Sequence, residues 1–171
     1  MVTREQLIAA ARLRLGTPYQ HQGRDGFGLD CIGLLLVVAH ELGLSDFDFL
    51  EYSTRPDGVT FQRLCGAHMD EIPVTEARAG DVLLLRFGRL PQHAGILTSA
   101  SNAECFKCGV RRAECGVQIT DSAFPTPHSA LCTPHLTMIH ALNRYGVIEH
   151  RLDAAWLSRI VAAYRVRGLE D

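Results

Sequence analysis

The sequence predicts an α+β domain in which N-terminal helices pack on an antiparallel sheet. Two observations lead to this class. Helical patterns dominate roughly the first 70 residues, and strand-like apolar runs separated by turn residues follow after about residue 80. The 171 residues show no internal repeat and no linker, so we expect a single domain over residues 1–171. A hydrophobic content of 47% and a charged content of 21% are typical of a soluble globular protein.

The charge balance excludes some classes of partner. The chain has 17 basic and 19 acidic residues and a net charge of -2, which argues against nucleic acid as the main partner. No basic amphipathic segment or apolar run of membrane-spanning length is visible, so no membrane partner is expected. Residues 1–6 lack the pattern of a secretory signal, which predicts synthesis in the cytoplasm, where most of the six cysteines would be reduced.

The first predicted element is a helix over about residues 3–15. Thr3 and Gln6 have the spacing of a capping box, and the apolar residues of the segment share one helical face. Gly16 and Pro18 end the helix. The glycine-rich residues 16–28 then form a loop, in which Tyr19, His21 and Gln22 are candidates for lining a site; a turn with a surface tyrosine is the alternative.

A second helix is expected to begin at Cys31. Asp30 is a suitable N-cap, an apolar run of helical length follows, and Gly43 is a suitable C-terminal stop. The free N–H groups and partial positive charge at a helix N-terminus favour a thiolate, the form of cysteine that attacks carbonyl groups. A small buried hydrophobic residue is the alternative interpretation of Cys31.

The later elements follow from apolar runs and turn signals. The apolar residues 82–87 are typical of a strand buried on both faces, and a turn at 88–92 predicts an antiparallel hairpin with the next strand. The full set comprises a short helix over about 59–69, strands over 82–87, 93–98, 116–120, 136–142, 147–150 and 159–166, and one helical turn over 153–158. The alanines of 159–166 leave a helix as the alternative for that segment.

Two of the eight histidines lie at informative places on these strands. His93 opens a strand after the hairpin turn and shares a face with Gly95, whose small size leaves room beside it. His140 shares a face with Met138 and Leu142, where a satisfied core histidine is the alternative to a functional one. Spacing alone does not show that Cys31, His93 and His140 meet.

Five short motifs give the chain a resemblance to the NlpC/P60 family of papain-like cysteine peptidases, and in particular to its short phage and gene-transfer-agent cell-wall peptidases. In family order they are Gly16-Thr17-Pro18-Tyr19, Asp30-Cys31-Ile32-Gly33, Gly80-Asp81-Val82-Leu83, His93-Ala94-Gly95-Ile96 and Ile139-His140-Ala141. Each motif is weak alone, but together they cover most of residues 5–166.

The resemblance implies a papain-like fold and a Cys-His-His triad. Cys31 would be the nucleophile, His93 the general base that later protonates the leaving amine, and His140 the group that orients His93. The backbone N–H of Cys31 and the hydroxyl of Tyr19 would hold the oxyanion. Asp30 and Tyr19 would help bind the free amino group of a peptidoglycan stem peptide, with a plain N-cap as the alternative role for Asp30.

The family's usual reaction is hydrolysis of an amide in the stem peptide, commonly between D-γ-glutamyl and diaminopimelate or lysine. Ile32 stands where many bacterial members have serine, and neither wall-binding modules nor a signal peptide is visible. This pattern predicts delivery to the cell wall by a phage-like particle, with phage-tail proteins as partners. The rival functions are a structural tail component, disfavoured by the intact triad, and a thiol amidase or acyltransferase acting on a different substrate.

A cysteine-rich insert occupies about residues 99–134. Cys105 and Cys108 form a C-x-x-C pair, which suits two corners of a tetrahedral zinc site, and Cys115 and Cys132 could complete it. His128 and His135 are substitutes for these ligands. A redox-active pair and ordinary thiols in a loop are the alternatives. Catalysis itself would need no cofactor.

Overall fold

A computed structural model of the chain describes residues 1–54, 57–99 and 136–170. A six-stranded antiparallel sheet forms its centre, in the order β4-β9-β5-β6-β7-β8. Its strands are β4 (Met69–Ile72), β5 (Val82–Phe87), β6 (Leu90–Ser99), β7 (Thr137–Leu142), β8 (Gly146–Arg151) and β9 (Ile160–Val166). The helices are α1 (Arg4–Arg12), α2 (Cys31–Glu41), α3 (Thr60–His68) and α4 (Ala154–Leu157), with a 3-10 turn at Val74–Glu76. The α+β class predicted from the sequence is confirmed.

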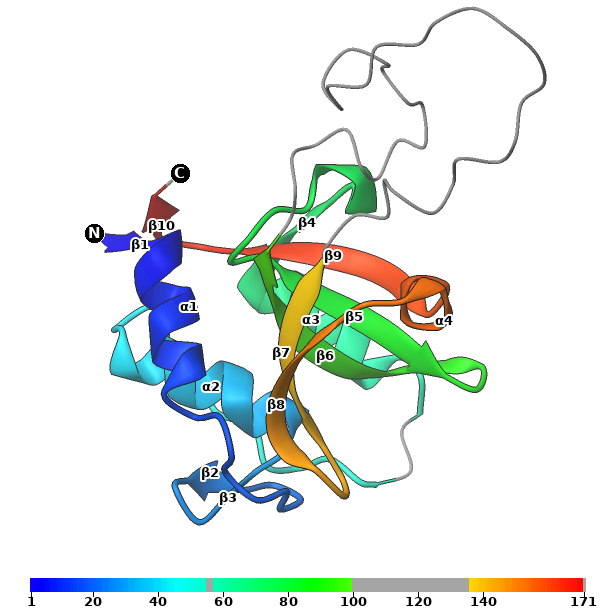
Figure 1. Cartoon of the computed structure of the whole chain (residues 1–171), viewed down its shortest axis with the longest axis horizontal. Coiled ribbons are helices and arrows are strands. Elements are labelled where there is room, and N and C mark those ends of the chain that lie inside the picture. The colour runs from blue at the N-terminus through cyan, green and yellow to red at the C-terminus, as the bar shows by residue number, and fades with distance from the viewer. Residues whose placement is uncertain (55–56, 100–135, 171) are drawn as a thin grey trace, which may run out of the picture.

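Side chains from alternate positions of the strands pack on the two faces of the sheet. Val82 and Leu84 of β5 face the side covered by α3, whereas Leu83 and Leu85 face the side covered by α4. This explains why β5 is apolar at consecutive positions. Helices α1 and α2 pack against β6, β7 and β8, and Figure 1 shows them together beside β7 and β8.

Local sequence signals determine where the first two helices begin. Thr3 and Gln6 form the capping box of α1, which ends at Arg12, earlier than the predicted residue 15. Asp30 caps α2 by accepting a hydrogen bond from the Gly33 N–H. The chain leaves α2 through Gly43, at a φ of +64° that favours glycine.

Several small elements were not predicted. The loop over residues 16–28 contains a hairpin of two-residue strands, β2 (Arg24–Asp25) and β3 (Gly28–Leu29). The termini pair through β1 (Val2–Thr3) and β10 (Leu169–Glu170), which lie side by side in Figure 1. Such short strands lack a periodic pattern, and β4 is a mostly exposed edge strand. The predicted strand at 116–120 lies outside the described residues.

A buried ion network joins the first helix to the sheet. Asp81, fully buried at the start of β5, accepts a 2.8 Å bond from Arg4 Nη1 of α1 and a 3.2 Å bond from Arg165 Nη2 of β9. The backbone N–H of Arg78 donates to the same carboxylate. The Gly-Asp motif at residues 80–81 therefore has a structural role, and it does not line the pocket that contains Cys31 and His93.

Gly95 of β6 is a point of close packing beside His93. A Cβ atom there would lie 2.6 Å from Met138 Sδ and 2.8 Å from the Ile139 carbonyl oxygen, both in β7. The space that glycine leaves is therefore occupied by Met138. We expect Gly95→Ala to lower the free energy of unfolding by about 1–3 kcal/mol, because the sheet must shift to accept the methyl group.

Thermal and denaturant unfolding of the Gly95→Ala variant tests this expectation. Gly66→Ala is the matched control, because Gly66 lies within α3 and a Cβ there meets nothing within 4 Å. Alanine is the better helix former, so the control should gain stability by up to about 1 kcal/mol. Equal stability of wild type and Gly95→Ala would contradict the packing argument.

Candidate active site

Cys31 is the first residue of α2 and lies in the wall of a pocket of about 1030 Å³. Tyr19, Asp30 and His93 line the same pocket, together with His21 and Tyr52. The Cys31 thiol hydrogen-bonds with the backbone of Ala94, the residue that follows His93 in β6. The structure thus places the predicted nucleophile and the predicted base at one site, although they lie 62 residues apart in sequence.

His93 and His140 are directly connected. The two rings lie on the neighbouring strands β6 and β7, and the distance between His93 Nε2 and His140 Nδ1 is 2.7 Å. Both side chains are buried, with His140 fully inaccessible to solvent. Because this contact occupies Nε2 of His93, Nδ1 is the ring nitrogen left for another partner. A cysteine and a histidine that is hydrogen-bonded to a second polar group are the residue types that a nucleophile and its base require.

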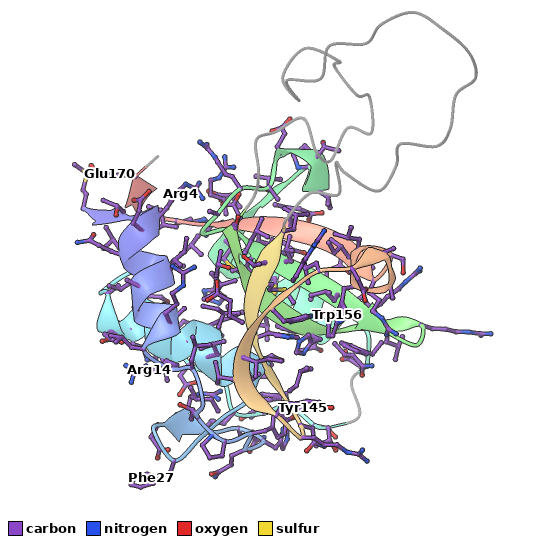
Figure 2. The ribbon with its side chains drawn as sticks, viewed as in Figure 1. Arg4, Arg14, Phe27, Tyr145, Trp156 and Glu170 are labelled. Carbon is purple, nitrogen blue, oxygen red and sulfur yellow. The ribbon has the colours of Figure 1, made fainter. Side chains whose placement is uncertain are left out.

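An aromatic enclosure surrounds the histidine pair. Trp156 of α4, labelled in Figure 2, has its ring centroid 5.0 Å from that of His140 and 6.4 Å from that of His93. Phe87 of β5 contacts His93 edge-on at 5.2 Å and Trp156 at 5.7 Å. These rings fix the two imidazoles and keep water from them.

Burial keeps the thiol and the base uncharged in the free enzyme. Loss of water around the thiol raises the pKa of Cys31 to about 12, and the negative charge of Asp30 acts in the same direction. Hydrogen bonding with the backbone of Ala94 and Ile32 opposes this rise but does not cancel it. Burial lowers the pKa of His93 to about 4, with a further lowering by His150 and an opposing effect of Asp30.

The N-terminus of α2 favours a thiolate at Cys31, as expected from the sequence, but burial acts in the opposite direction and is the larger effect. The helix end acts on the thiol only over a short range, whereas removal of water penalises the charged form strongly. Burial thus disfavours the charged forms of both the Cys31 thiol and the His93 imidazole.

Asp30 is the centre of a polar cluster at the N-terminus of α2. Its Oδ1 atom accepts the capping bond from the Gly33 N–H. Its Oδ2 atom accepts a 2.7 Å bond from the Tyr52 hydroxyl and another from the backbone N–H of Gln22. Arg24 Nη1 lies 3.8 Å from Oδ1, and His21 Nδ1 lies 3.5 Å from Oδ2. Gln22 adopts a φ of +59° to make its contact. The N-cap role of Asp30 is thus observed, and the cluster places a buried carboxylate beside Cys31.

Tyr19 lies near both Cys31 and Asp30. Burial raises the pKa of its hydroxyl, and charges on Cys31 and Asp30 raise it further. The hydroxyl therefore stays protonated and able to donate a hydrogen bond. Tyr52 belongs to the same wall of the pocket, and burial followed by the bond to Asp30 raises its pKa as well.

Sequence reasoning missed three residues of the site: Tyr52, Arg24 and His150. His150 of β8 has its Nδ1 atom 3.0 Å from His140 Nε2. Tyr52 belongs to an irregular acidic segment with no periodic pattern that would place it. His150 left a usable signal, because an antiparallel hairpin over residues 136–150 brings it onto the same face as His140.

The described residues contain no cluster of three or more histidine, cysteine, aspartate or glutamate side chains arranged to hold a metal ion. The predicted zinc ligands Cys105, Cys108, Cys115 and Cys132 lie outside the described residues. No helix in the described ranges is both long and apolar enough to cross a membrane.

Comparison with known proteins identifies the family. The sequence model of the NlpC/P60 family matches residues 16–165. The solved NlpC/P60 domain of the peptidoglycan hydrolase SagA superposes with a TM-score of 0.51 at 18% identity, covering 95% of this chain and 98% of that one. No curated protein sequence gives a significant match.

Two further solved structures share the fold. A lipoprotein-like NLP/P60 protein from Staphylococcus aureus gives a TM-score of 0.55 at 18% identity, covering 98% of this chain and 42% of that one. An NlpC/P60 protein from Bacillus cereus gives 0.57 at 16% identity, with 96% and 40% covered. This chain thus spans about two fifths of those two proteins. The matched family model covers most of the chain, and the chain belongs to the NlpC/P60 family of cysteine peptidases and peptidoglycan hydrolases.

Proposed function

We propose that the protein hydrolyses an amide bond in peptidoglycan stem peptides, between D-γ-glutamyl and diaminopimelate or lysine. The observation that carries this proposal is the pocket lined by Cys31, His93 and the buried Asp30, with His140 hydrogen-bonded to His93. Family membership and the shared fold with the peptidoglycan hydrolase SagA support the same substrate.

The proposed reaction proceeds in two steps that use only residues of this pocket. The thiol of Cys31 loses its proton to Nδ1 of His93 and attacks the amide carbonyl, and the resulting oxyanion is held by the Cys31 backbone N–H and the Tyr19 hydroxyl. His93 returns the proton to the leaving amine, which departs and leaves a thioester. Water, deprotonated by His93, then hydrolyses the thioester and regenerates the thiol.

The Asp30 cluster is proposed to select a stem peptide with a free amino terminus. The positive charge of an ammonium group would balance the negative charge of the buried Asp30 carboxylate. The hydroxyls of Tyr19 and Tyr52 flank the carboxylate. Arg24 offsets part of the carboxylate charge from 3.8 Å away. A stem peptide whose amino group is blocked would place a neutral group against Asp30. The carboxylate would then lose water without gaining a charge pair in return.

The direct test is mass spectrometry of defined muropeptides incubated with the protein under reducing conditions. We expect two fragments whose masses identify cleavage after D-γ-glutamate. Cleavage at a different bond would show that the protein is a peptidase but that the proposed scissile bond is wrong. Absence of cleavage of every stem peptide, with Cys31 still open to alkylation, would reject the cell-wall substrate.

We expect Asp30→Asn to reduce the preference for a free amino terminus. Asparagine retains the N-cap of α2, so the change removes mainly the charge. The ratio of kcat/KM for a free stem tripeptide to that for its N-acetylated form should fall by about tenfold or more, because a close charge pair in a partly buried site is lost. Steady-state kinetics on the two peptides measure this ratio.

Asp48→Asn is the matched control for this test. Asp48 also pairs with Arg24, at 2.9 Å from its Nε, but it does not line the Cys31 pocket. The ratio of kcat/KM for the free and the N-acetylated tripeptide should be the same in Asp48→Asn as in wild type. Equal losses on both peptides in Asp30→Asn would assign Asp30 to helix capping alone.

The motif resemblance extends the proposal to the setting of the enzyme. We propose synthesis in the cytoplasm and delivery to the cell wall in a phage-like particle, with phage-tail proteins as partners. Co-purification of the chain with such particles, detected by mass spectrometry, would support this setting.

A further inference from the structure

A third histidine continues the catalytic pair across the sheet. His93, His140 and His150 lie on the consecutive strands β6, β7 and β8. Their ring nitrogens are 2.7 Å apart at the first contact and 3.0 Å apart at the second. The His140 and His150 rings also stack, with centroids 4.7 Å apart and planes inclined by 23°. Each ring of the row thus uses a nitrogen to reach the next.

The row admits two consistent orders of protons. In the first, each histidine carries its proton on Nε2 and accepts at Nδ1, so that His93 donates to His140 and His140 donates to His150. The one donor left over is then the Nε2–H of His150, which has no hydrogen-bond partner among the described residues. In the second, every proton is on Nδ1 and every bond is reversed. Only the first order leaves Nδ1 of His93 without a proton, and that atom is the one that must accept the proton of Cys31.

We propose that His150 is a positioning residue that selects the first order. Its Nδ1 atom accepts the Nε2–H of His140, which leaves Nδ1 of His140 as the acceptor that holds His93 in its basic tautomer. His150 touches neither substrate nor thiol and acts through His140. This inference rests on the proposed use of Cys31 and His93 in catalysis.

The surroundings of His140 give this bond its importance. The side chain is fully buried, and its Nε2 atom has His150 as its hydrogen-bond partner among the described residues. Without that acceptor, an Nε2–H would be a buried donor with no partner, which is unfavourable. A shift of the His140 proton from Nε2 to Nδ1 would avoid that cost. The Nδ1–H of His140 would then face the Nε2–H of His93, and His93 would have to move its own proton to Nδ1, the atom that must stay free.

The charges around the row favour the same role. Burial lowers the pKa of His140 to about 2, with further lowering by His93 and His150, so His140 stays neutral when His93 becomes an imidazolium. Burial also lowers the pKa of His150, whereas the nearby carboxylate of Asp153 raises it. Trp156 packs against the rings of both His140 and His150, with ring centroids 5.0 Å and 4.8 Å away, and so helps to hold the two rings in place.

The test compares His150→Leu with His150→Asn. The two replacement side chains have nearly the same shape, but only asparagine presents an oxygen close to the position of Nδ1. We expect His150→Leu to lower kcat by about 10- to 100-fold with little change in KM, as for other partners that orient a reacting group from one step away. His150→Asn should keep kcat within about threefold of wild type.

A second measurement reads the tautomers without any substrate. Two-bond ¹H–¹⁵N correlation spectra of the histidine rings distinguish a proton on Nε2 from one on Nδ1. We expect the Nε2–H form for His93 and His140 in wild type and in His150→Asn, and loss of that uniform pattern in His150→Leu. Circular dichroism and thermal unfolding check that both variants are folded.

The two measurements separate this inference from the proposed function. If wild type cleaves no muropeptide but its tautomers depend on residue 150 as described, the substrate proposal fails and the positioning role stands. If His150→Leu keeps both the wild-type kcat and the Nε2–H pattern, the positioning role is wrong. Equal kinetic losses in the leucine and asparagine variants would likewise overturn it, because they would show a purely structural role for the ring.

Discussion

Replacement of Cys31 by alanine is expected to lower the rate of stem-peptide cleavage by about 10⁴-fold or more. In the proposed mechanism the thiol forms the covalent intermediate, and loss of a nucleophile removes both chemical steps while substrate binding persists. The measurement is the single-turnover rate of muropeptide cleavage by wild type and variant, followed by mass spectrometry.

Cys65→Ala is the control for this experiment. Cys65 is the second cysteine among the described residues and lines the same pocket, but it is buried within α3. Its removal should leave cleavage within a few-fold of wild type, apart from a loss of stability from the small cavity. Residual cleavage by Cys31→Ala at more than a few per cent of the wild-type rate would contradict the assignment of the nucleophile.

The protonation state of Cys31 gives this prediction a second readout. Since burial raises the pKa of the thiol to about 12, alkylation of Cys31 by iodoacetamide should be slow at pH 6 and should accelerate as the pH rises. Peptide mapping identifies the labelled cysteine. A preformed thiolate–imidazolium pair would instead give rapid alkylation that is already constant at pH 5–6.

The sequence allowed prediction of those parts of the site that depend on local signals. The cap at Asp30, the helix that starts at Cys31 and the strand that carries His93 all follow from spacing within a few residues, and each is present in the structure. The motifs then predicted that these elements meet, and the pocket places Cys31 and His93 together. Catalytic roles for these residues remain predictions until the variants are measured.

The missed residues depend on contacts between distant segments. Tyr52 reaches Asp30 from 22 positions away, through a segment with neither helical nor strand periodicity. Arg24 joins the same cluster from a hairpin of two-residue strands. The high pKa of Cys31 was also beyond local reasoning, because it follows from the burial of the thiol by packing around it. Local patterns do not contain that information.

His150 is an intermediate case, since its contact could be derived from two predicted strands and the turn between them. The register pairs Met138 with His150 and His140 with Ile148. Residues on one face of neighbouring strands alternate in steps of two, so His150 lies diagonally opposite His140. A register counted outward from the turn at residues 143–146 would have placed the two rings together.

Replacement of His93 by glutamine is expected to lower kcat by about 10³-fold or more. Glutamine can fill the space and contact His140, but it cannot take the proton of Cys31, which at neutral pH is bound to sulfur. The loss should be larger than for an enzyme with a preformed thiolate, because here the proton must leave in the same step as the attack. His40→Gln, on an exposed position of α2, is the matched control and should retain wild-type kcat.

The pH dependence of wild-type kcat/KM tests the same role of His93 without a mutation. Only the neutral imidazole accepts the proton, so the active form is the one present above its pKa. Burial lowers that pKa to about 4, which predicts that activity persists at pH 5–6 and falls only as the pH approaches 4. A histidine with its ordinary pKa near 6.5 would already have lost most of its activity at pH 5.5. An acid limb near pH 6.5 would therefore show that water reaches His93 in the working enzyme, whereas a limb near pH 4 would show that the enclosure by Phe87 and Trp156 keeps the base neutral.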